Sequence, residues 1–417
     1  MPTATDREPA AAGGSLFAIG DFVRLWMAGC ISNVVQWLEM LVVALYVYQT
    51  THSALLVALT ATCRLAPFAF LGAAIGALVD RFQPRTILRC VVGAAIVSSS
   101  TIATLATLGW LQVWMLWPLI FVNGVITAAD LPIRRLMMGE VVGAARMRQA
   151  MAVDAATNNL SRVAGPLVGG VLAASMGMSV FWLSAAALLG VFLTVSSVNL
   201  RTTRAPAALQ RSYLGQIVGG MKLVKQDTGL AGVFVITAIY NLVGWPAVSM
   251  APVIAKGGFG LTESQVGLMV SLDGMGAFLA ALALRHWAPA DSYGRIFCAS
   301  MVFYLVMMVG FAASANPAMA GIFLFASGFG GAGFAVMQVT LIYLLSSPET
   351  RGLILGLLAT CIGLSPLGVL HIGVLAEIFG AQKAVIIMGV EGLVLTALTL
   401  KLWRGVAGVG LAPQNTR

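Results

Sequence analysis

Charged side chains are scarce in this chain of 417 residues. Asp, Glu, Lys and Arg together make up 9% of the sequence, whereas hydrophobic residues make up 59%. A soluble domain usually carries about 25% charged residues. With a mean hydropathy of +0.93, the composition excludes a soluble globular protein. It indicates a polytopic membrane protein, whose architecture is set by the lipid around it.

The sequence also has little of what a disulfide framework, a metal site or a nucleotide-hydrolysing enzyme requires. Its five cysteines include no Cys-x-x-Cys pair, and its three histidines lie far apart without metal-ligand spacing. No Gly-x-x-x-x-Gly-Lys-Ser/Thr motif occurs. The run 328–333 matches a dinucleotide-binding pattern, but it lies inside an apolar segment with no preceding strand. We therefore expect no enzyme, no cofactor and no bound metal.

Basic residues outnumber acidic ones, with a net charge of +9, yet they form no basic run. Nucleic-acid binding is therefore not expected. No cleavable signal peptide is evident. Residues 1–17 are polar and rich in Ala and Gly, so we expect a disordered cytoplasmic N-terminus, followed by a span that serves as its own insertion signal.

Twelve apolar windows are long enough to cross about 30 Å of hydrocarbon, which takes about 20 helical residues. They cover residues 22–48, 53–79, 86–109, 112–135, 149–175, 178–199, 229–255, 263–284, 293–313, 317–345, 352–379 and 382–403. The longest link, 200–228, separates the first six from the last six. We predict an all-α membrane protein with an N-terminal bundle (18–199), a cytoplasmic linker (200–228), a C-terminal bundle (229–404) and a cytoplasmic tail (405–417).

The distribution of Lys and Arg predicts the orientation, because cytoplasmic loops carry an excess of both. With both termini in the cytoplasm, 20 of the 24 face inward, while Lys256 and Lys383 face outward and Arg64 and Arg162 lie within spans. In the linker, apolar residues recur at helical spacing between 209 and 224. This pattern fits a helix on the inner leaflet surface or, equally, a linker helix packed on the two bundles.

A charged hairpin lies between the second and third spans, with the sequence Gly-Ala-Leu-Val-Asp-Arg-Phe-Gln-Pro-Arg over 76–85. Together with twelve spans in two halves, it resembles the signature loop of the major facilitator superfamily of transporters. The resemblance implies two pseudosymmetric six-helix bundles and a cytoplasmic latch on the conformational cycle, made by Gly76, Asp80, Arg81 and Arg85. The carboxylate would face the positive dipole end of the eleventh helix. Gln and Pro at 83–84 depart from the family pattern.

A small-residue motif in the fifth span is similar to the motif common in exporters and antiporters of this superfamily. It comprises Ser161, Gly165, Pro166, Gly169 and Gly170. Small residues at helical spacing let another helix approach closely, and the proline frees a backbone carbonyl. The resemblance favours export over import, while the alternative is glycines that serve packing alone.

Three local patterns refine the resemblance. They are Asp-Phe-Val-Arg-Leu-Trp at 21–26, Asp-Leu-Pro-Ile-Arg-Arg at 130–135 and Pro-Glu-Thr-Arg-Gly at 348–352. Together they resemble the subgroup that contains enterobactin-type siderophore exporters and macrolide efflux proteins. Ile120 stands where proton–drug antiporters commonly have an arginine, so the usual proton relay of that group is not carried over.

Ionisable groups deep in a span cost a few kcal/mol each and are candidates for function. Arg162 and Asp273 each lie near mid-membrane in the fifth and eighth spans, which are neighbours across the two halves in this fold. We expect a charge pair that breaks and reforms with protonation, or else a static structural pair. Asp154 lies on the same helix face as Arg162. Glu39 either pairs with Arg64 or carries the proton itself, with its pKa raised by burial.

Further candidates lie at the ends and along the centre of the spans. Asp130, Arg134 and Arg135 are expected to form a cytoplasmic gate or loop pair. A segment at 241–246 is expected to interrupt the seventh span, as a broken helix at a binding site does. By analogy with the fold, the substrate cavity lies between spans 1, 4, 7 and 10. Its polar and aromatic candidates are Asn33, Gln36, Trp37, Asn123, Tyr240, Asn241, Trp245, Gln338 and Tyr343.

The resemblance and the paired charges predict a secondary active transporter, a proton-coupled exporter of a small amphipathic molecule of drug or siderophore type. We expect a monomer in a bacterial-type inner membrane, with protons, lipid and a small-molecule substrate as its partners. Two alternatives stay open. One is a specific metabolite or lysophospholipid carrier, and the other is a transporter-fold sensor or assembly factor that no longer transports.

The hairpin provides a first test. Asp80→Asn should reduce the rate of efflux about tenfold, because a lost contact of about 1.4 kcal/mol in one state of the cycle shifts that equilibrium by this factor. Efflux would be measured against the amount of inserted protein, with Asp80→Glu as the charge-keeping control. Normal efflux by the Asn variant would show that the carboxylate has no latch role.

Overall fold

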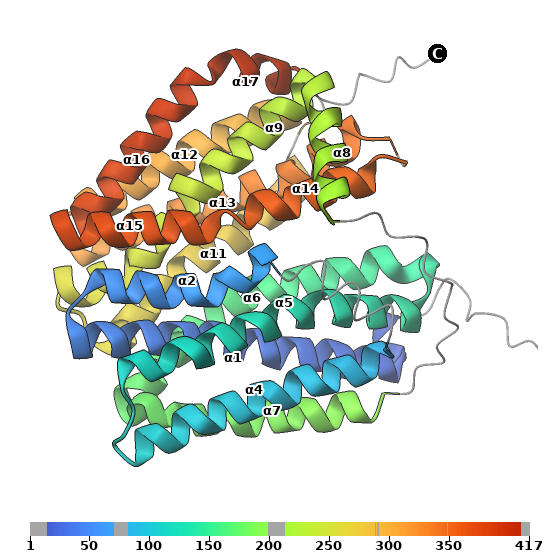
Figure 1. Ribbon diagram of the computed structural model, residues 1–417. Helices are drawn as coiled ribbons and strands as arrows, with labels where there is room; N and C mark the ends of the chain where they lie inside the picture. Colours follow the sequence, from blue (N-terminus) through green and yellow to red (C-terminus); the bar gives the residue numbers. More distant parts are fainter. Residues whose placement is uncertain are drawn as a thin grey trace, which may run out of the picture.

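The computed structural model describes residues 15–70, 82–198, 213–287, 289, 292–347 and 349–409 of the chain, and the described elements are helical (Figure 1). Within the described residues, the first half contains six long helices and two short 3₁₀ turns. They are η1 (Leu16–Ala18), α1 (Gly20–Thr51), α2 (Ala54–Phe70), α4 (Pro84–Thr107), α5 (Val113–Val142), α6 (Ala144–Met176), η2 (Gly177–Val180) and α7 (Phe181–Ser196).

The second half begins with the linker helix α8 (Tyr213–Gln226). Its seventh span is not a single α-helix: it runs through α9 (Thr228–Ile239), a π-helical turn η3 (Tyr240–Gly244), a 3₁₀ turn η4 (Trp245–Met250), α10 (Ala251–Val253) and a second π turn η5 (Ile254–Gly258). The remaining helices are α11 (Glu263–Trp287), α12 (Tyr293–Ala313), α13 (Pro317–Leu345), α14 (Arg351–Ile362), α15 (Ser365–Phe379), α16 (Ala381–Leu398) and α17 (Leu400–Ala407).

The number of spans agrees with the sequence prediction. Among the described residues, ten helices are long and apolar enough to cross a membrane, and one of these, 145–196, contains both α6 and α7. The helix 54–69 is apolar but shorter. Counting α6 and α7 separately and including α2 gives the twelve predicted spans, in the predicted order.

The bounds of several predicted spans shift by a few residues, and two spans differ in a way that needs a physical explanation. The fourth was expected to end at residue 135, but α5 continues to Val142 and includes Pro132 and both arginines at 134–135. The charged residues ended the apolar window, yet their charges are paired inside the protein, so the helix continues. The eleventh span is broken at Gly363 and Leu364, and α15 restarts with Pro366 in its first turn, where a proline costs no hydrogen bond.

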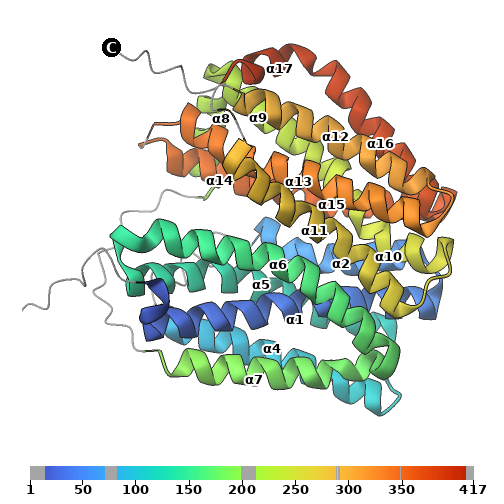
Figure 2. The same cartoon turned by 180° about the vertical axis from the view of Figure 1, so that it is seen from behind.

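The helices form two bundles that lie side by side (Figures 1 and 2). Helices α1, α2 and α4–α7 make the first bundle, and the helices from α9 to α17 make the second. Within the first bundle, α4 and α7 lie farthest from the second, whereas α2 packs against α15 and α6 against α11. We call the contact between the bundles the seam. The end where α1 begins and α17 ends is the termini side, and the other end is the opposite side.

Glycines allow α6 and α11 to cross closely at the seam. A Cβ atom at Gly267 would lie 2.4 Å from the carbonyl oxygen of Pro166, and one at Gly170 would lie 2.8 Å from the Cα of Gly267. Further along, a Cβ at Gly274 would lie 2.7 Å from the carbonyl oxygen of Arg162. Pro166 has no N–H to bond this carbonyl, which is four residues earlier. The freed carbonyl therefore faces the glycine on α11.

The linker helix α8 packs on one bundle. A Cβ at Gly220 would lie 3.1 Å from the carbonyl oxygen of Leu353 on α14, and Leu223 and Val224 pack against the main hydrophobic core. The two lysines of α8 are exposed. The packed arrangement was predicted to involve both bundles, whereas these contacts of α8 are with the second bundle. The predicted linker residues 200–212 lie outside the described residues.

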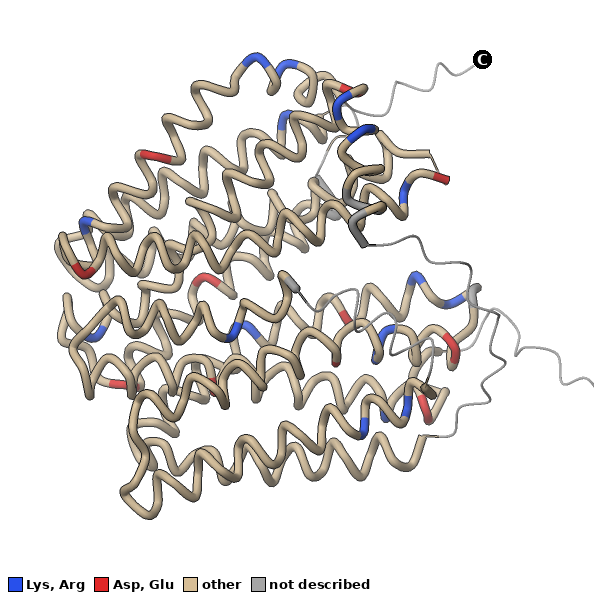
Figure 3. Tube along the Cα trace, viewed as in Figure 1, with Lys and Arg blue, Asp and Glu red and all other residues tan. Residues whose placement is uncertain are grey.

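Basic residues gather at one end of the molecule. Figure 3 shows most of the Lys and Arg residues of both bundles at the termini side. At the opposite side, Lys256 lies in η5 and Lys383 in the first turn of α16. The unequal distribution of Lys and Arg that the sequence predicts is therefore also present between the two ends of the folded protein.

The glycine contact at the seam can be tested with a matched pair of substitutions. Gly267→Ala should lower the free energy of unfolding by about 1–3 kcal/mol, because the added methyl group meets the backbone of α6 and forces the helices apart. Gly190→Ala on α7 meets nothing within 4 Å and should be neutral or slightly stabilising. Thermal unfolding of both variants in lipid nanodiscs measures the difference. Equal stability of the two would contradict a tight seam.

Candidate functional site

An ion pair joins the two bundles near the middle of the seam. Arg162 Nη2 on α6 lies 2.6 Å from Asp273 Oδ2 on α11, and the guanidinium carbon lies 5.6 Å from the ring centroid of Trp37 on α1. The side chains are 26% and 10% exposed, so the pair is only partly shielded. The structure thus brings together the two charges that the sequence placed near mid-membrane.

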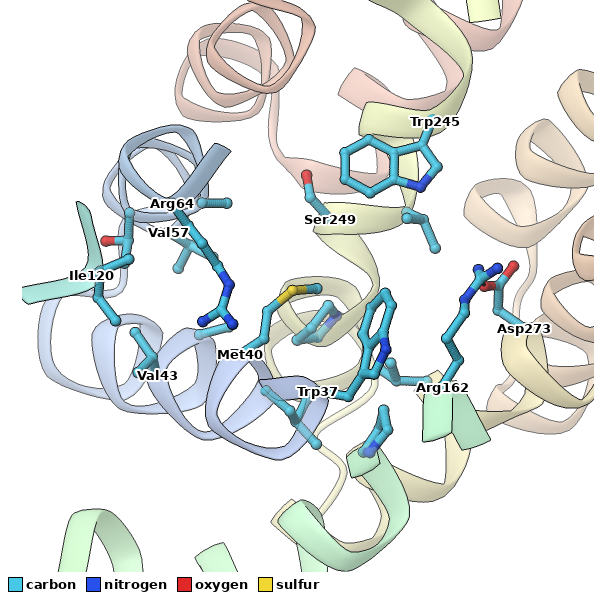
Figure 4. Close-up of a pocket in the computed structure, with 18 residues that line it drawn as sticks. Trp37, Met40, Val43, Val57, Arg64, Ile120, Arg162, Trp245, Ser249 and Asp273 are labelled. Carbon is cyan, nitrogen blue, oxygen red and sulfur yellow. The ribbon is translucent and has the colours of Figure 1, made fainter. Parts of the chain in front are cut away.

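Two cavities border this pair. The tryptophan cavity has a volume of about 80 Å³, and its wall includes Trp37, Met40, Arg64, Ile120, Trp245 and Ser249. In Figure 4, Arg64 lies on one side of it and the Arg162–Asp273 pair on the other, with Trp37, Met40 and Trp245 between them. The tyrosine cavity has a volume of about 320 Å³, and its wall includes Phe68, Tyr240, Asn241, Tyr304, Phe334 and Gln338. Both cavities share Arg162, Trp245, Val248 and Asp273.

Stacked aromatic rings form one wall of the tyrosine cavity. The ring of Phe334 stacks on Tyr240 at 4.0 Å and on Phe297 at 4.9 Å between centroids, and Tyr240 meets Tyr304 at 5.1 Å. The hydroxyl of Tyr304 is buried and has no hydrogen-bond partner. This wall offers a flat apolar surface and one free hydroxyl. The sequence analysis did not select Tyr304 or Phe334 as cavity residues. Tyr304 could have been selected, because a tyrosine in the middle of an apolar span is a polar group that needs an explanation.

The interruption predicted in the seventh span is present as η3 and η4, and it brings polar side chains to the tyrosine cavity. These groups already bond each other. Asn241 Nδ2 donates to the carbonyl of Thr237 at 2.9 Å, Ser365 Oγ donates to Asn241 Oδ1 at 2.9 Å, and Gln338 Nε2 donates to Thr237 Oγ1 at 2.7 Å. The interrupted helix can therefore carry polar side chains at this depth, because these side chains are paired by hydrogen bonds.

A small polar pocket lies inside the first bundle, beyond Arg64. Gln36, Glu39, Arg64 and Asn123 line it. Glu39 Oε1 accepts a hydrogen bond from Ser99 Oγ at 2.8 Å, and Arg64 Nη2 donates to the carbonyl of Gln36 at 3.5 Å. Glu39 and Arg64 share this pocket but form no direct ion pair. Of the two sequence hypotheses, direct pairing of Glu39 with Arg64 is not seen.

A second group of charges, which we call the arginine cluster, lies toward the termini side of the first bundle. Arg134 Nη2 lies 3.1 Å from Asp130 Oδ2 and 3.5 Å from Asn33 Oδ1, and Arg134 Nη1 lies 3.8 Å from Asp154 Oδ1. Arg135 Nε donates to Asp154 Oδ2 at 2.8 Å. Arg134 and Asp154 are each 2% exposed. The cluster ties α1, α5 and α6 together within one bundle.

Two candidates belong to the arginine cluster. Asp154, a charge-pair candidate on the same helix face as Arg162, pairs with Arg134 and Arg135, about 12 Å along the helix from Arg162. Asn33 is likewise buried against Arg134, and it is not part of either cavity wall.

Helix α6 is packed between α1 and α11 by its small residues. A Cβ at Gly165 would lie 2.4 Å from the Cβ of Trp37, and one at Gly169 would lie 3.1 Å from the Cα of Leu38. Ser161 Oγ donates to the carbonyl of Thr157 in its own helix. With Gly170 on the α11 side, the predicted motif serves two helix contacts at once, one in the bundle and one at the seam.

Two other predictions do not bear on the cavities. Tyr343 is 49% exposed and lines neither cavity; instead, the guanidinium of Arg351 lies 4.5 Å from its ring centroid. In the predicted latch, Gly76, Asp80 and Arg81 lie outside the described residues. Arg85 is described, and its Nη2 donates to the carbonyl of Ser196 at the end of α7.

Polar contacts join the bundles at the opposite side. Gln49 Nε2 at the end of α1 donates to Glu263 Oε1 at 2.6 Å, and Lys256 Nζ donates to the same oxygen at 2.7 Å. Ser53 Oγ donates to Glu377 Oε2 of α15 at 2.9 Å. These residues sit in short loops and helix ends, which the sequence pattern did not single out. They hold the two bundles together at this end.

Comparisons with known proteins agree with this architecture. The chain matches the family model described as transmembrane secretion effector over residues 12–406. Macrolide efflux protein A of Streptococcus pyogenes is 21% identical over 384 residues, which cover 88% of this chain and 92% of that protein. The staphyloferrin A transporter of Staphylococcus aureus is 21% identical over 366 residues, which cover 86% and 90%.

A solved structure has the same fold. It is a bacterial homologue of the human lysosomal transporter Spinster, in an inward-facing and unoccupied conformation. The TM-score is 0.76 at 13% identity, and the match covers 96% of this chain and 100% of that one.

The arginine cluster predicts a clear difference between two acidic residues. Asp154→Asn should lower the free energy of unfolding by about 3–5 kcal/mol, because it leaves the buried Arg134 short of a counter-charge. Asp21→Asn removes an acid whose partner Arg24 is 49% exposed, and should cost about 1 kcal/mol or less. Denaturation of both variants in the same detergent measures the two effects. Similar losses would mean that the cluster adds little to stability.

Proposed function

Because this chain belongs to the transmembrane secretion effector family of the major facilitator superfamily, we propose that it exports small amphipathic molecules in exchange for protons, by alternating access. It is a multi-pass membrane transporter and not an enzyme. Relatives named for macrolide efflux and for staphyloferrin A transport support a cargo of drug or siderophore type.

One observation carries the coupling proposal: the ion pair between Arg162 and Asp273 spans the seam and borders both cavities. In alternating access the two bundles rock against each other around a central site. Any change at the seam must alter this pair. A proton on Asp273 removes its negative charge and so weakens the attraction between α6 and α11. In our proposal, the proton gradient acts on the conformational equilibrium through this carboxyl group.

The proposed orientation follows from the basic residues at the termini side, since Lys and Arg are enriched in cytoplasmic loops. The termini are then cytoplasmic. The contacts of Glu263 with Gln49 and of Glu377 with Ser53 then close the outer end. In this state the cavities would communicate with the cytoplasm, where an exporter loads. The similar fold of an inward-facing relative supports this assignment.

In this scheme the two moving bodies are residues 18–199 and 229–404, joined by the linker over 200–228. Asp80, Arg81 and Arg85 would form the cytoplasmic latch between them. Asp130, Arg134 and Arg135 were predicted to form a gate. Their contacts lie within the first bundle, so we propose that they act by keeping α1, α5 and α6 together as one body.

The proposed coupling is tested in proteoliposomes with an imposed pH gradient and a panel of amphipathic substrates. The wild-type protein should drive substrate into the acidic compartment. Asp273→Asn should reduce this accumulation about tenfold or more, because a group that no longer titrates cannot transfer gradient energy. Exchange of substrate without a gradient should persist in this variant.

The matched control is Glu391→Gln, which removes an intramembrane acid whose partner is His371 and which lines neither cavity. It should keep gradient-driven transport. Accumulation by Asp273→Asn at the wild-type level would refute coupling through this residue. Movement of wild-type substrate into the alkaline compartment would instead indicate symport and refute export by exchange.

A further inference from the structure

Arg64 is a buried cation with an unused hydrogen-bond donor. It is 6% exposed, and its Nη1 atom is buried without a partner. Its Nη2 atom makes one long contact of 3.5 Å with the carbonyl of Gln36. A guanidinium carries five N–H donors, and a buried charged donor without an acceptor is costly. The tertiary structure therefore holds the guanidinium group in place but supplies no acceptor for its Nη1 atom.

The charges around the tryptophan cavity leave Arg64 without a partner on the wall. Arg162 and Asp273 form an ion pair with each other, on the side of the cavity that lies away from Arg64 (Figure 4). Glu39 is an acidic residue in the polar pocket beyond Arg64. It accepts a hydrogen bond from Ser99 and is not part of the wall of the tryptophan cavity. The wall itself thus presents one positive side chain, Arg64, that no acid of the wall pairs with.

The rest of the wall suits an apolar or aromatic body. Trp37, Met40 and Trp245 lie between Arg64 and the ion pair, and Trp245 also borders the tyrosine cavity with its stacked rings. A molecule with its charged end at Arg64 can therefore place its apolar part along the tryptophans toward Tyr240. Aromatic faces contribute large contact areas for such a body.

We propose that the cavity selects amphipathic anions, with a carboxylate group bound by Arg64 and an aromatic or apolar body between Trp37 and Trp245. The proposal rests on the proposed function, since it names the substrate class of the same cavity. It gives Arg64 a ligand-binding role in place of the predicted pairing with Glu39. Amphipathic cations are disfavoured, because they would bring a second positive charge to Arg64.

The test uses three dansyl probes that share one fluorophore and differ in charge: N-dansyl-6-aminohexanoate (anion), dansylcadaverine (cation) and N-dansyl-hexylamine (neutral). Binding to the purified protein in phosphatidylcholine nanodiscs is followed by fluorescence anisotropy, with empty nanodiscs subtracted. The anion should bind about tenfold more tightly than the cation, as expected for one charge-assisted contact.

Variants of Arg64 show whether this residue sets the preference. Arg64→Gln should weaken anion binding about tenfold and leave binding of the neutral probe within about twofold, which also shows that the variant is folded. Arg64→Lys should keep most of the preference. Arg24→Gln removes an exposed charge about 20 Å along α1 from Trp37 and should change nothing.

The outcomes separate this inference from the proposed function. Equal or tighter binding of the cation, unchanged anion binding in Arg64→Gln, or no anion binding at millimolar concentration each overturns the anion proposal. If the anion preference depends on Arg64 but no probe is moved by a pH gradient, the binding proposal stands and proton-coupled export fails. If probes are transported without any anion preference, only the present inference fails.

Discussion

The seam between the bundles depends on one ion pair in a medium that cannot solvate charge. Arg162 and Asp273 meet because Gly267 and Gly274 let α11 come within backbone contact of α6. Without water to compensate them, two such charges are tolerated when they pair. Both cavities border this contact, so the packing of α6 on α11 determines both the walls that the cavities share and how the bundles meet.

Three arginines within the spans illustrate how the same residue type takes different roles. Arg134 is surrounded by Asp130 and Asp154 and holds helices of one bundle together. Arg162 has its partner on the other bundle, so its contact belongs to the seam. Arg64 keeps a donor free beside the tryptophan cavity. The difference lies in the acids nearby, since all three lie in apolar helices.

Much of the fold could be predicted because hydropathy reports directly on the lipid environment. The twelve spans, the six-plus-six order and the interruption predicted at 241–246 follow from local composition. The end of α5 could not be predicted, because Arg134 looks like a boundary until its buried partners are known. Tyr343 was wrongly placed at the cavity for a related reason: the sequence does not state which face of a helix looks inward.

The sequence by itself therefore determined the class of protein, the number of its spans, the asymmetry of its basic residues and the deep charges that need a partner. These properties depend on single residues and on their distance along one helix. The tertiary structure decided which acid meets which arginine: Asp273 for Arg162, Asp154 for Arg134 and Arg135, and no direct acid for Arg64. Such pairings depend on helix rotation and crossing, which arise from contacts between segments far apart in the chain.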